Sequence, residues 1–288
     1  MQVGKTPLIK LTERIYAKLE TYSPTGSVKD RMVNYVADYA KHSGILKQGM
    51  TLVEATSGNT GIALAAYGAA NNHPVVIIMP RNMSEERKQM MRVYGASIIE
   101  VDDSNFEQAI EKRNEMVTQP NMWSPMQFEN EKNIECHQLQ TAYEIFKDVN
   151  LVNKKEAKYR RRWDAFVSGA GTGGTMMGLK NFIDKQRLAT KCVLVSPAEP
   201  ADKHGIQGIN DGANFLLDIS LMDEITEIKT EDAKQKVLDL ARNYGLLVGI
   251  SAAANVLAAE EYESKTPESD GVIVTMLCDR GERYMSLF

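Results

Sequence analysis

Residues 52–70 read LVEATSGNTGIALAAYGAA, and this stretch decides the fold class of the protein. Its start, Leu52–Ala55, is mostly apolar and predicts a short buried strand. A turn with Gly58 and Gly61 follows, and the alanine-rich run Ile62–Ala70 then predicts a helix. A strand that passes through a glycine turn directly into a helix is the building unit of α/β proteins.

The same strand-to-helix rhythm continues along the chain. Val75–Met79 is entirely apolar and leads into a predicted helix over residues 84–94, with Ser84 as its N-cap. Ile98–Val101 precedes a further predicted helix over residues 105–116. The second half of the chain repeats the pattern, with strands predicted at Ala165–Ser168, Cys192–Ser196, Leu246–Val248 and Val272–Leu277.

These strands are continuous apolar runs rather than alternating ones. Such strands are buried on both faces, as in parallel sheets covered by helices. We therefore predict an α/β protein of two doubly wound lobes, each with a central, mostly parallel sheet. In such sheets ligands bind beyond the carboxyl ends of the strands, where loops lead into helices.

Charge and hydropathy exclude several classes of protein. The 288 residues include 34 Lys+Arg against 38 Asp+Glu, a formal charge of −4. Nucleic-acid and membrane-surface proteins need clustered positive charge, which the short basic patch Tyr159–Arg162 does not supply. No apolar stretch approaches the ~18 residues of a membrane span. The polar start MQVGKTP has no signal-peptide core, so we expect a cytoplasmic protein with neither a nucleic acid nor a membrane as partner.

Three cysteines, Cys136, Cys192 and Cys278, are scattered through the chain. They form neither a CxxC pair nor a disulfide framework. Free cysteine behaves as a small apolar residue and is often buried. We therefore expect buried thiols and no metal site.

A lysine at the start of a predicted helix is the first candidate for chemistry. Lys29 lies in the first helical turn after the turn Ser23–Gly26. The positive end of the helix dipole disfavours an ammonium there, so that the amine can attack a carbonyl. Taken alone, the position also fits an exposed surface lysine.

Two more segments at predicted strand ends could bind anions. Thr56–Gly61 gathers hydroxyls, an amide and backbone N–H groups at a helix N-terminus, which suits a carboxylate or, alternatively, only a polar cap. In Gly171–Thr175 glycines let the backbone approach a phosphate, and threonines add donors. This segment lacks the P-loop lysine and the acidic residue of a dinucleotide site, so it could hold one phosphate monoester. Ser251, at another strand-to-helix turn, is either an N-cap or a further site residue.

A reactive lysine, a carboxylate site and a phosphate site in one α/β cleft fit pyridoxal 5'-phosphate, whose aldehyde forms a Schiff base with lysine. The matching motifs are GKTPLIKL, SPTGSVKDR, EATSGNTGIALA, MPRNMSEER, GTGGT, IQGI, GIS and GERYMS. With them the sequence closely resembles the cysteine synthase (O-acetylserine sulfhydrylase) family of fold type II pyridoxal-phosphate enzymes, which are similar to the tryptophan synthase β chain. CDRGERY together with MPRNMS resembles the B isozyme group more than the A group.

The resemblance implies a role for each matching residue. Lys29 would form the Schiff base and move the Cα proton, and Ser251 would face the pyridine nitrogen. Asn59 would contact the 3'-oxygen of the cofactor. The substrate carboxylate would be held by Thr56, Ser57, Thr60 and Gln127. The cofactor phosphate would be held by Gly171, Thr172, Gly173, Gly174 and Thr175.

The resemblance also implies the reaction and the organisation. A neutral serine leaves the pyridine ring a weaker electron sink than an aspartate would, which favours loss of a leaving group from Cβ. The expected activity is β-replacement on a three-carbon amino acid through an aminoacrylate, with O-acetylserine and sulfide giving cysteine. A homodimer is expected, with a substrate-carboxylate lobe at residues 25–130 and a cofactor-phosphate lobe at residues 1–24 and 131–288.

One position departs from the family pattern and leaves the nucleophile open. In Ile209–Gly212 an aspartate stands where the related groups have a small or a basic residue. The carboxylate of Asp211 would repel sulfide anions and could act as a general base, so that cysteine and water give serine and hydrogen sulfide. A solvated loop acid is the other reading of Asp211. A third alternative, a non-catalytic binding protein of the same fold, is disfavoured by intact Lys29, Asn59 and Ser251.

Overall fold

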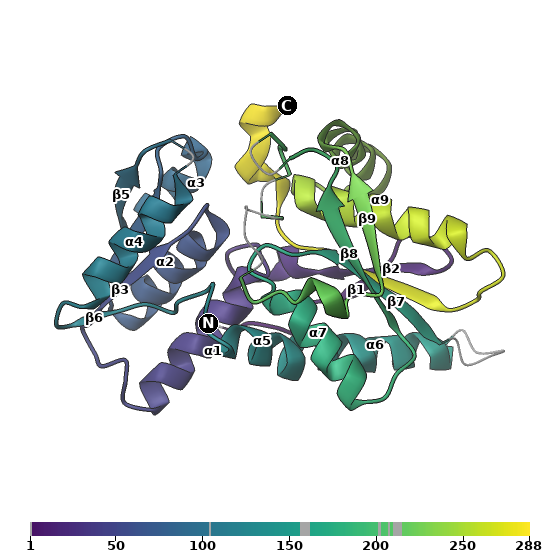
Figure 1. The fold of residues 1–288 in the computed structure, drawn as a ribbon, viewed down its shortest axis with the longest axis horizontal. Helices are drawn as coiled ribbons and strands as arrows, with labels where there is room; N and C mark the ends of the chain where they lie inside the picture. The colour runs from purple at the N-terminus through teal and green to yellow at the C-terminus, as the bar shows by residue number, and fades with distance from the viewer. Residues whose placement is uncertain (1, 104, 156–161, 201–202, 207, 210–214) are drawn as a thin grey trace.

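The chain folds around two separate β-sheets, each with helices on both faces (Figure 1). The structure is a computed structural model that describes residues 2–103, 105–155, 162–200, 203–206, 208–209 and 215–288. Within these ranges no helix has the length and apolar character needed to cross a membrane.

The larger sheet has six strands in the order β1-β2-β10-β7-β8-β9. All neighbouring strands are parallel except the β1–β2 pair. Their bounds are β1 Leu8–Lys10, β2 Ile15–Leu19, β7 Trp163–Gly169, β8 Lys191–Pro197, β9 Glu224–Ile228 and β10 Val272–Leu277. Successive residues of β7 enter different cores, because Ala165 and Val167 join one cluster and Phe166 joins the other. The sheet is thus buried on both faces.

Helices from separate parts of the chain cover the two faces of this sheet. The first core contains residues of α8 (Thr230–Tyr244) and α9 (Ile250–Lys265). The second contains residues of α6 (Ala142–Lys155) and α7 (Gly174–Lys185). The short helix α5 (Lys132–Cys136) packs on α7 and continues into the π-helical turn His137–Thr141.

The smaller sheet has four parallel strands in the order β5-β4-β3-β6. Their bounds are β3 Thr51–Ala55, β4 Val75–Pro80, β5 Ser97–Val101 and β6 Met122–Trp123. One core holds residues of α1 (Lys29–His42), α2 (Asn59–Asn71) and α3 (Glu85–Val93). On the opposite face packs α4 (Phe106–Val117). The predicted α/β class with mostly parallel sheets is confirmed.

One predicted strand is wrong. Leu246–Val248 forms the connection between α8 and α9, with a single β-bridge from Val248 to Arg280. Gly245 ends α8 in the left-handed conformation (φ 67°), and the backbone N–H of Leu246 donates to Leu240 O. The apolar segment therefore closes a helix and fills the core instead of joining the sheet.

The predicted cap at Ser84 is also different. Ser84 stands at the N-cap position of α3, but its side chain accepts no capping hydrogen bond. Its hydroxyl donates instead to Arg283 O at 3.3 Å. Arg283 lies in the last helical turn, Gly281–Leu287, which Figure 1 shows rising next to α3. The serine therefore ties α3 to the C-terminal segment.

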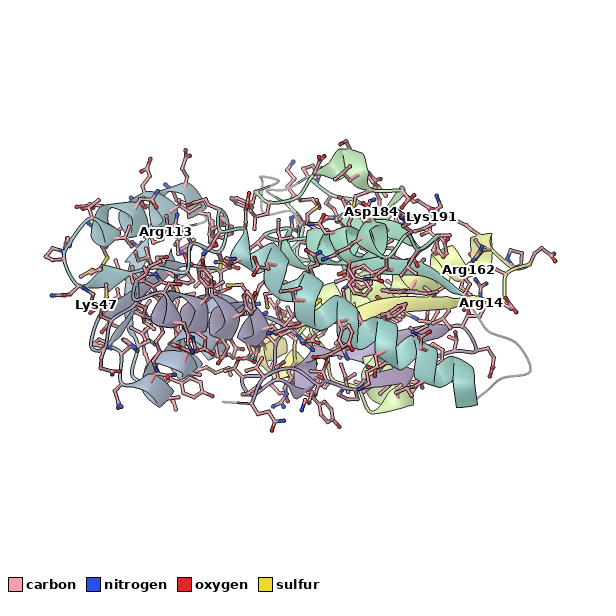
Figure 2. The ribbon with its side chains drawn as sticks, turned by 90° about the horizontal axis from the view of Figure 1, so that it is seen from below. Arg14, Lys47, Arg113, Arg162, Asp184 and Lys191 are labelled. Atoms are coloured by element: carbon pink, nitrogen blue, oxygen red, sulfur yellow. The ribbon has the colours of Figure 1, made fainter. Side chains whose placement is uncertain are left out.

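Charged side chains also close the far end of the larger sheet. Figure 2 shows Arg14, Arg162 and Lys191 at the end of the molecule opposite Arg113. Arg14 and Arg162 both contact Asp164, at 3.5 and 2.8 Å, near the start of β7. Because ligands bind beyond the other ends of the strands, we assign these ion pairs a structural role.

Candidate active site

The carboxyl ends of the strands open onto two adjoining pockets. The first, named the cup pocket, is lined by residues that include Gly173, Thr175, Ser251, Asn255 and Cys278. The second, named the cradle pocket, is lined by residues that include Thr56, Ser57, Thr60, Gln127 and Phe128. Both pockets share Lys29, Asn59, Gly171, Thr172 and Gly208. The structure thus brings together the predicted site residues except Gly174 and Asp211.

Lys29 is the first residue of α1 and is half-buried between the two pockets. The turn before it is fixed by Asp30, whose carboxylate accepts from the backbone N–H and the hydroxyl of Thr25 at 3.0 and 2.9 Å. Ser27 forms a β-bridge with Asp279 on the larger sheet's side. Lys29 therefore projects from a helix start that is held by both halves of the molecule.

A buried ion cluster anchors the same helix start. Arg31 is fully buried, and its Nε donates to Glu20 Oε2 at 2.7 Å. Its Nη1 and Nη2 donate to the carboxylate of Glu144 at 2.9 and 2.8 Å. Because Glu20 follows β2 and Glu144 lies in α6, the cluster fixes α1 to the larger sheet. No local pattern predicts this cluster, because its members are far apart in the chain.

The glycine cup, defined as Gly171–Thr175, joins β7 to α7. Gly173 has φ +88°, and a Cβ there would lie 2.4 Å from the backbone N of Leu217, so only glycine fits. A Cβ on Gly171 would lie 2.6 Å from Gly208 O. The first turn of α7 has no acidic residue, and its N–H groups lack acceptors within the helix. Backbone donors and a positive helix end suit a phosphate.

Gly174 is placed differently from the other cup residues. It does not line either pocket, and a Cβ on it would lie 2.1 Å from Asn133 Oδ1. Its backbone N–H donates to Thr172 Oγ1 at 3.3 Å. Gly174 thus allows Asn133 to approach the cup.

The hydroxyl cradle consists of Thr56, Ser57, Thr60 and Gln127. The hydroxyl of Thr60 donates to Gln127 Oε1 at 2.6 Å, and Gln127 Nε2 donates to Ala55 O at 2.8 Å. The hydroxyl oxygen of Thr56 accepts from Gly58 N at 3.0 Å. Thr56, Thr60 and Gln127 are each less than 4% exposed. Thr60 and Gln127 are therefore bonded to each other, and Thr56 and Gln127 are also bonded to the backbone.

A buried ion pair behind the cradle was missed in the sequence. Glu54 Oε2 accepts from the backbone N–H of Gln127 at 3.1 Å, and Glu54 Oε1 accepts from Arg113 Nη1 at 3.3 Å. Burial raises the pKa of Glu54, and the guanidinium of Arg113 opposes that rise. Figure 2 shows Arg113 in the smaller half. Glu54 inside an otherwise mostly apolar strand could have indicated a buried partner of opposite charge.

Asn59 is held by the C-terminal segment, whose residues also went unassigned. Its Nδ2 donates to Asp279 Oδ2 at 2.7 Å, and its Oδ1 accepts from Arg283 Nη1 at 2.6 Å. The hydroxyl of Tyr284 donates to the same Asp279 oxygen at 2.5 Å. An arginine can only donate and a carboxylate accepts, so these partners fix which way the Asn59 amide faces. Asp279, Arg283 and Tyr284 all stand in the CDRGERY motif, but the sequence alone did not show that the first two contact Asn59.

Ser251 and Cys278 line the cup pocket with uncharged groups. Ser251 is 6% exposed, and among the described residues no group forms a hydrogen bond with its hydroxyl. Burial, and then the charge of Asp279, raise the pKa of Cys278 to about 12, so its thiol is neutral near pH 7. A ligand nitrogen near Ser251 would therefore meet a neutral partner.

Asp211 lies outside the described residues. Its described neighbours in the chain are Ile209, which lines the cup pocket, and Phe215. The ring of Phe215 packs on Phe128 of the cradle pocket, with centroids 4.4 Å apart. The role predicted for Asp211 remains a prediction.

The pockets match the chemistry of pyridoxal 5'-phosphate. The cup offers backbone N–H groups and hydroxyls at a helix start, without a carboxylate along the described lining of the cup pocket. Lys29 borders the same pocket and can attack an aldehyde. Residues for a phosphate, an aldehyde and a pyridine nitrogen are therefore present in one place.

Comparisons with known proteins agree with this chemistry. A family model described as "Pyridoxal-phosphate dependent enzyme" matches residues 1–279. A probable cysteine synthase of Bacillus subtilis is 35% identical over 304 residues, covering 99% of this chain and 94% of that protein. Cysteine synthase B of Campylobacter jejuni is 37% identical over 300 residues, with coverages of 99% and 95%. The resemblance to the cysteine synthase family is confirmed.

Solved structures give the same result. O-ureido-L-serine synthase is 33% identical with a TM-score of 0.90, covering 99% of this chain and 92% of that chain. A hydrogen sulfide-producing enzyme from Fusobacterium nucleatum is 38% identical with a TM-score of 0.89, covering 99% and 88%. With a family match over nearly its whole length, the chain belongs to the pyridoxal-phosphate dependent enzymes, and its cofactor is pyridoxal 5'-phosphate.

Proposed function

We propose that this enzyme catalyses β-replacement on a three-carbon amino acid and forms cysteine from O-acetylserine and sulfide. The observation that carries the proposal is the meeting of Lys29, the hydroxyl cradle and the glycine cup around two pockets that share a wall. The cysteine synthases among its relatives support the choice of substrates. Pyridoxal 5'-phosphate, when bound, supplies an electron sink for the Cα–H and Cβ bonds of the amino acid.

The residues divide the work by their chemistry. The glycine cup and its threonines would hold the cofactor phosphate, and Asn59 would donate its second amide hydrogen to the cofactor's 3'-oxygen. Thr60 and Gln127 hold the substrate carboxylate with Thr56 and Ser57. The Nζ of Lys29 takes the proton from Cα and returns it. A neutral Ser251 next to the ring nitrogen favours loss of the group on Cβ.

A second reaction is supported by specific observations. Solved relatives at 34% and 38% identity are hydrogen sulfide-producing enzymes from Fusobacterium nucleatum. Cysteine would then bind in the same site, lose its thiol from Cβ as hydrogen sulfide and gain water at Cβ, which gives serine. Asp211 is the proposed general base for the water. Both reactions use the same cradle and cup and differ in the nucleophile.

Product analysis distinguishes these reactions. The purified enzyme loaded with cofactor is given O-acetylserine and sulfide in one reaction and cysteine alone in another. Chromatography then measures cysteine and serine, and a sulfide assay measures gas release. We expect cysteine in the first reaction. Serine and sulfide from cysteine alone at a higher rate would favour the second reaction, and a cofactor-bound protein without either product would indicate a binding protein.

The proposal also covers the division into lobes, the oligomeric state and the cellular location. Residues 25–130 form the substrate-carboxylate lobe, while residues 1–24 and 131–288 form the cofactor-phosphate lobe. In support, strands β3–β6 fall in the first group and all strands of the larger sheet in the second. The enzyme acts as a homodimer in the cytoplasm. Light scattering coupled to size exclusion would give the mass in solution, and a monomeric mass would contradict the dimer.

A further inference from the structure

Asn133 connects the two halves of the candidate site from behind. It is the second residue of α5 and is 2% exposed. Its Nδ2 donates to the backbone carbonyl of Gln127 at 2.9 Å and to Thr172 Oγ1 at 3.0 Å. Gln127 belongs to the hydroxyl cradle and Thr172 to the glycine cup. One buried amide group thus contacts both anion-binding regions.

The hydrogen-bond partners determine the orientation of this amide. A backbone carbonyl only accepts, so the Asn133 atom that faces Gln127 O must be the nitrogen. The nitrogen carries two hydrogens, and both are used, one on Gln127 O and one on Thr172 Oγ1. Asn133 is therefore a donor toward Thr172 and cannot accept its proton.

This orientation restricts Thr172 in turn. A hydroxyl has one hydrogen to donate and two lone pairs that accept. Thr172 Oγ1 accepts from Asn133 Nδ2 at 3.0 Å and from the backbone N–H of Gly174 at 3.3 Å. Its lone pairs are then occupied, and only its hydrogen remains available. Among the described residues no group accepts that hydrogen, while Thr172 lines both pockets.

We infer that Asn133 is a positioning residue that makes Thr172 an obligatory donor to an anionic oxygen of the bound ligand. The inference rests on the proposed function for the presence of that anion. The proposed function assigns Thr172 to the cofactor phosphate; because Thr172 also lines the cradle pocket, the test includes the substrate carboxylate as the other acceptor. Asn133 itself does not reach either pocket lining and acts on the ligand through Thr172.

A double-mutant cycle tests the inference on the intact enzyme after removal of its cofactor. The variants are Asn133→Ala, Thr172→Val and the double variant, and each is titrated with pyridoxal 5'-phosphate and with pyridoxal, which lacks the phosphate. We expect each single change to weaken binding of the anionic ligand on the order of tenfold, the scale of a hydrogen bond to a charged group. The double variant should be no weaker than Thr172→Val alone, because Asn133 acts through that hydroxyl.

The arms of the experiment identify the anion. If the phosphate is the acceptor, affinity for pyridoxal 5'-phosphate falls and affinity for pyridoxal does not. If the carboxylate is the acceptor, both affinities stay at the parent values and the KM for the amino acid rises in the same non-additive way. Either result supports the inference. Additive losses, or unchanged affinities together with an unchanged KM, would overturn it.

Two controls separate positioning from general damage. Asn71→Ala removes a side-chain amide that donates to Tyr67 O at 2.9 Å and does not line the pockets, so it should leave both affinities unchanged. Asn133→Asp keeps the side-chain size but presents an acceptor, which would take the Thr172 hydrogen. Asn133→Asp should lose at least as much affinity for the anionic ligand as Asn133→Ala, and a smaller loss of affinity would contradict the inference. Failure of the proposed function would be seen separately: the unsubstituted enzyme would bind pyridoxal 5'-phosphate but form no product.

Discussion

The two helix starts that face the ligand, α2 with the hydroxyl cradle and α7 with the glycine cup, are built in opposite ways. In the cup, glycines bring backbone N–H groups to the pocket, and Thr172 has a free hydrogen to donate. In the cradle, the hydroxyl of Thr60 is already donated to Gln127 Oε1 at 2.6 Å. The hydrogen of Thr172 is therefore available to an anion before it arrives, whereas that of Thr60 is not.

This difference indicates which group binds permanently and which exchanges. A phosphate that accepts from Thr172 breaks no hydrogen bond between protein groups, so the binding energy of that contact is retained. A carboxylate that accepts from Thr60 must replace the Thr60–Gln127 bond, and this exchange lowers its net affinity. We therefore expect the cup to bind the cofactor tightly and the cradle to bind the substrate more weakly.

Removing Lys29 should have the largest effect, because both regions serve this one amine. Lys29→Ala should abolish turnover and also the covalent attachment of the cofactor that borohydride can reduce. Mass spectrometry of the borohydride-treated protein measures the attachment. Lys41→Ala, an exposed lysine of the same helix, is the control and should behave like the parent. A cofactor still covalently reducible in Lys29→Ala would show that another residue is the attachment site.

A methyl group added at Gly173 tests whether the glycine cup is rigid before the cofactor binds. In Gly173→Ala the added Cβ would meet the backbone of Leu217 at 2.4 Å, at a φ of +88°. We expect cofactor affinity to fall by roughly 10²-fold, from backbone strain and displacement of the cup together. Gly95→Ala is a matched control with φ +87° and nothing within 4 Å of the new Cβ. Equal cofactor affinities in the two variants would contradict a rigid, preformed cup.

A third substitution tests the general-base role proposed for Asp211. If Asp211 activates water, Asp211→Asn should lower serine formation from cysteine by roughly 10²-fold, the scale of losing a general base. The synthesis of cysteine from O-acetylserine should change much less, because Lys29 and the cradle are intact. Parallel product assays of parent and variant measure both rates. Equal serine yields would rule out the general-base role.

The exchangeable cradle predicts a smaller and more selective effect. Thr60→Val removes the bond to Gln127, and we expect the KM for the amino acid to rise about tenfold while cofactor affinity stays at the parent value. The control is Thr190→Val, which removes a buried hydroxyl that donates to Trp163 O at 2.7 Å, away from the pockets. A fall in cofactor affinity in Thr60→Val would mean that cradle and cup do not act separately.

The sequence predicted strands with continuous apolar runs better than strands whose runs are short or interrupted by charged residues, such as the buried β2 with Lys18. The continuous apolar strands at 75–79 and 272–277 are present, because burial on both faces leaves a simple pattern. The edge strand β9, with burial that alternates, was missed, and Leu246–Val248 was wrongly predicted as a strand. Short apolar segments do not distinguish a strand from a loop that fills the core.

The candidate site shows the same division. Lys29, the cradle and the cup stand in contiguous motifs, so they were found from the sequence. Asn133, Arg113 and Arg283 act through partners that are distant in the chain: Asn133 is 39 residues from Thr172. No local pattern encodes such a contact, because it exists only after the sheets and helices have packed.

The smallest expected effect concerns the support that cradle and cup share, the ion cluster under Lys29. Burial raises the pKa of Glu144, but the hydrogen bonds and charge of Arg31 outweigh it and lower the pKa to about 2, from an ordinary value of 4.5. A carboxylate with a lowered pKa in the folded state stabilises the protein above pH 4.5, and this stabilisation is lost as the pH falls toward 2. Glu144→Gln should remove it.

Thermal unfolding at several pH values measures this contribution. At pH 7 we expect Glu144→Gln to be less stable than the parent, with a melting temperature about 2 °C lower. The gap should shrink as the pH falls from 4.5 toward 2, because the carboxylate takes up its proton first in the unfolded chain and only near pH 2 in the folded protein, where it then loses its attraction to Arg31. Glu282→Gln, at an exposed position, should show no such gap. A gap that stays constant with pH would mean that Glu144 contributes through packing and not through its charge.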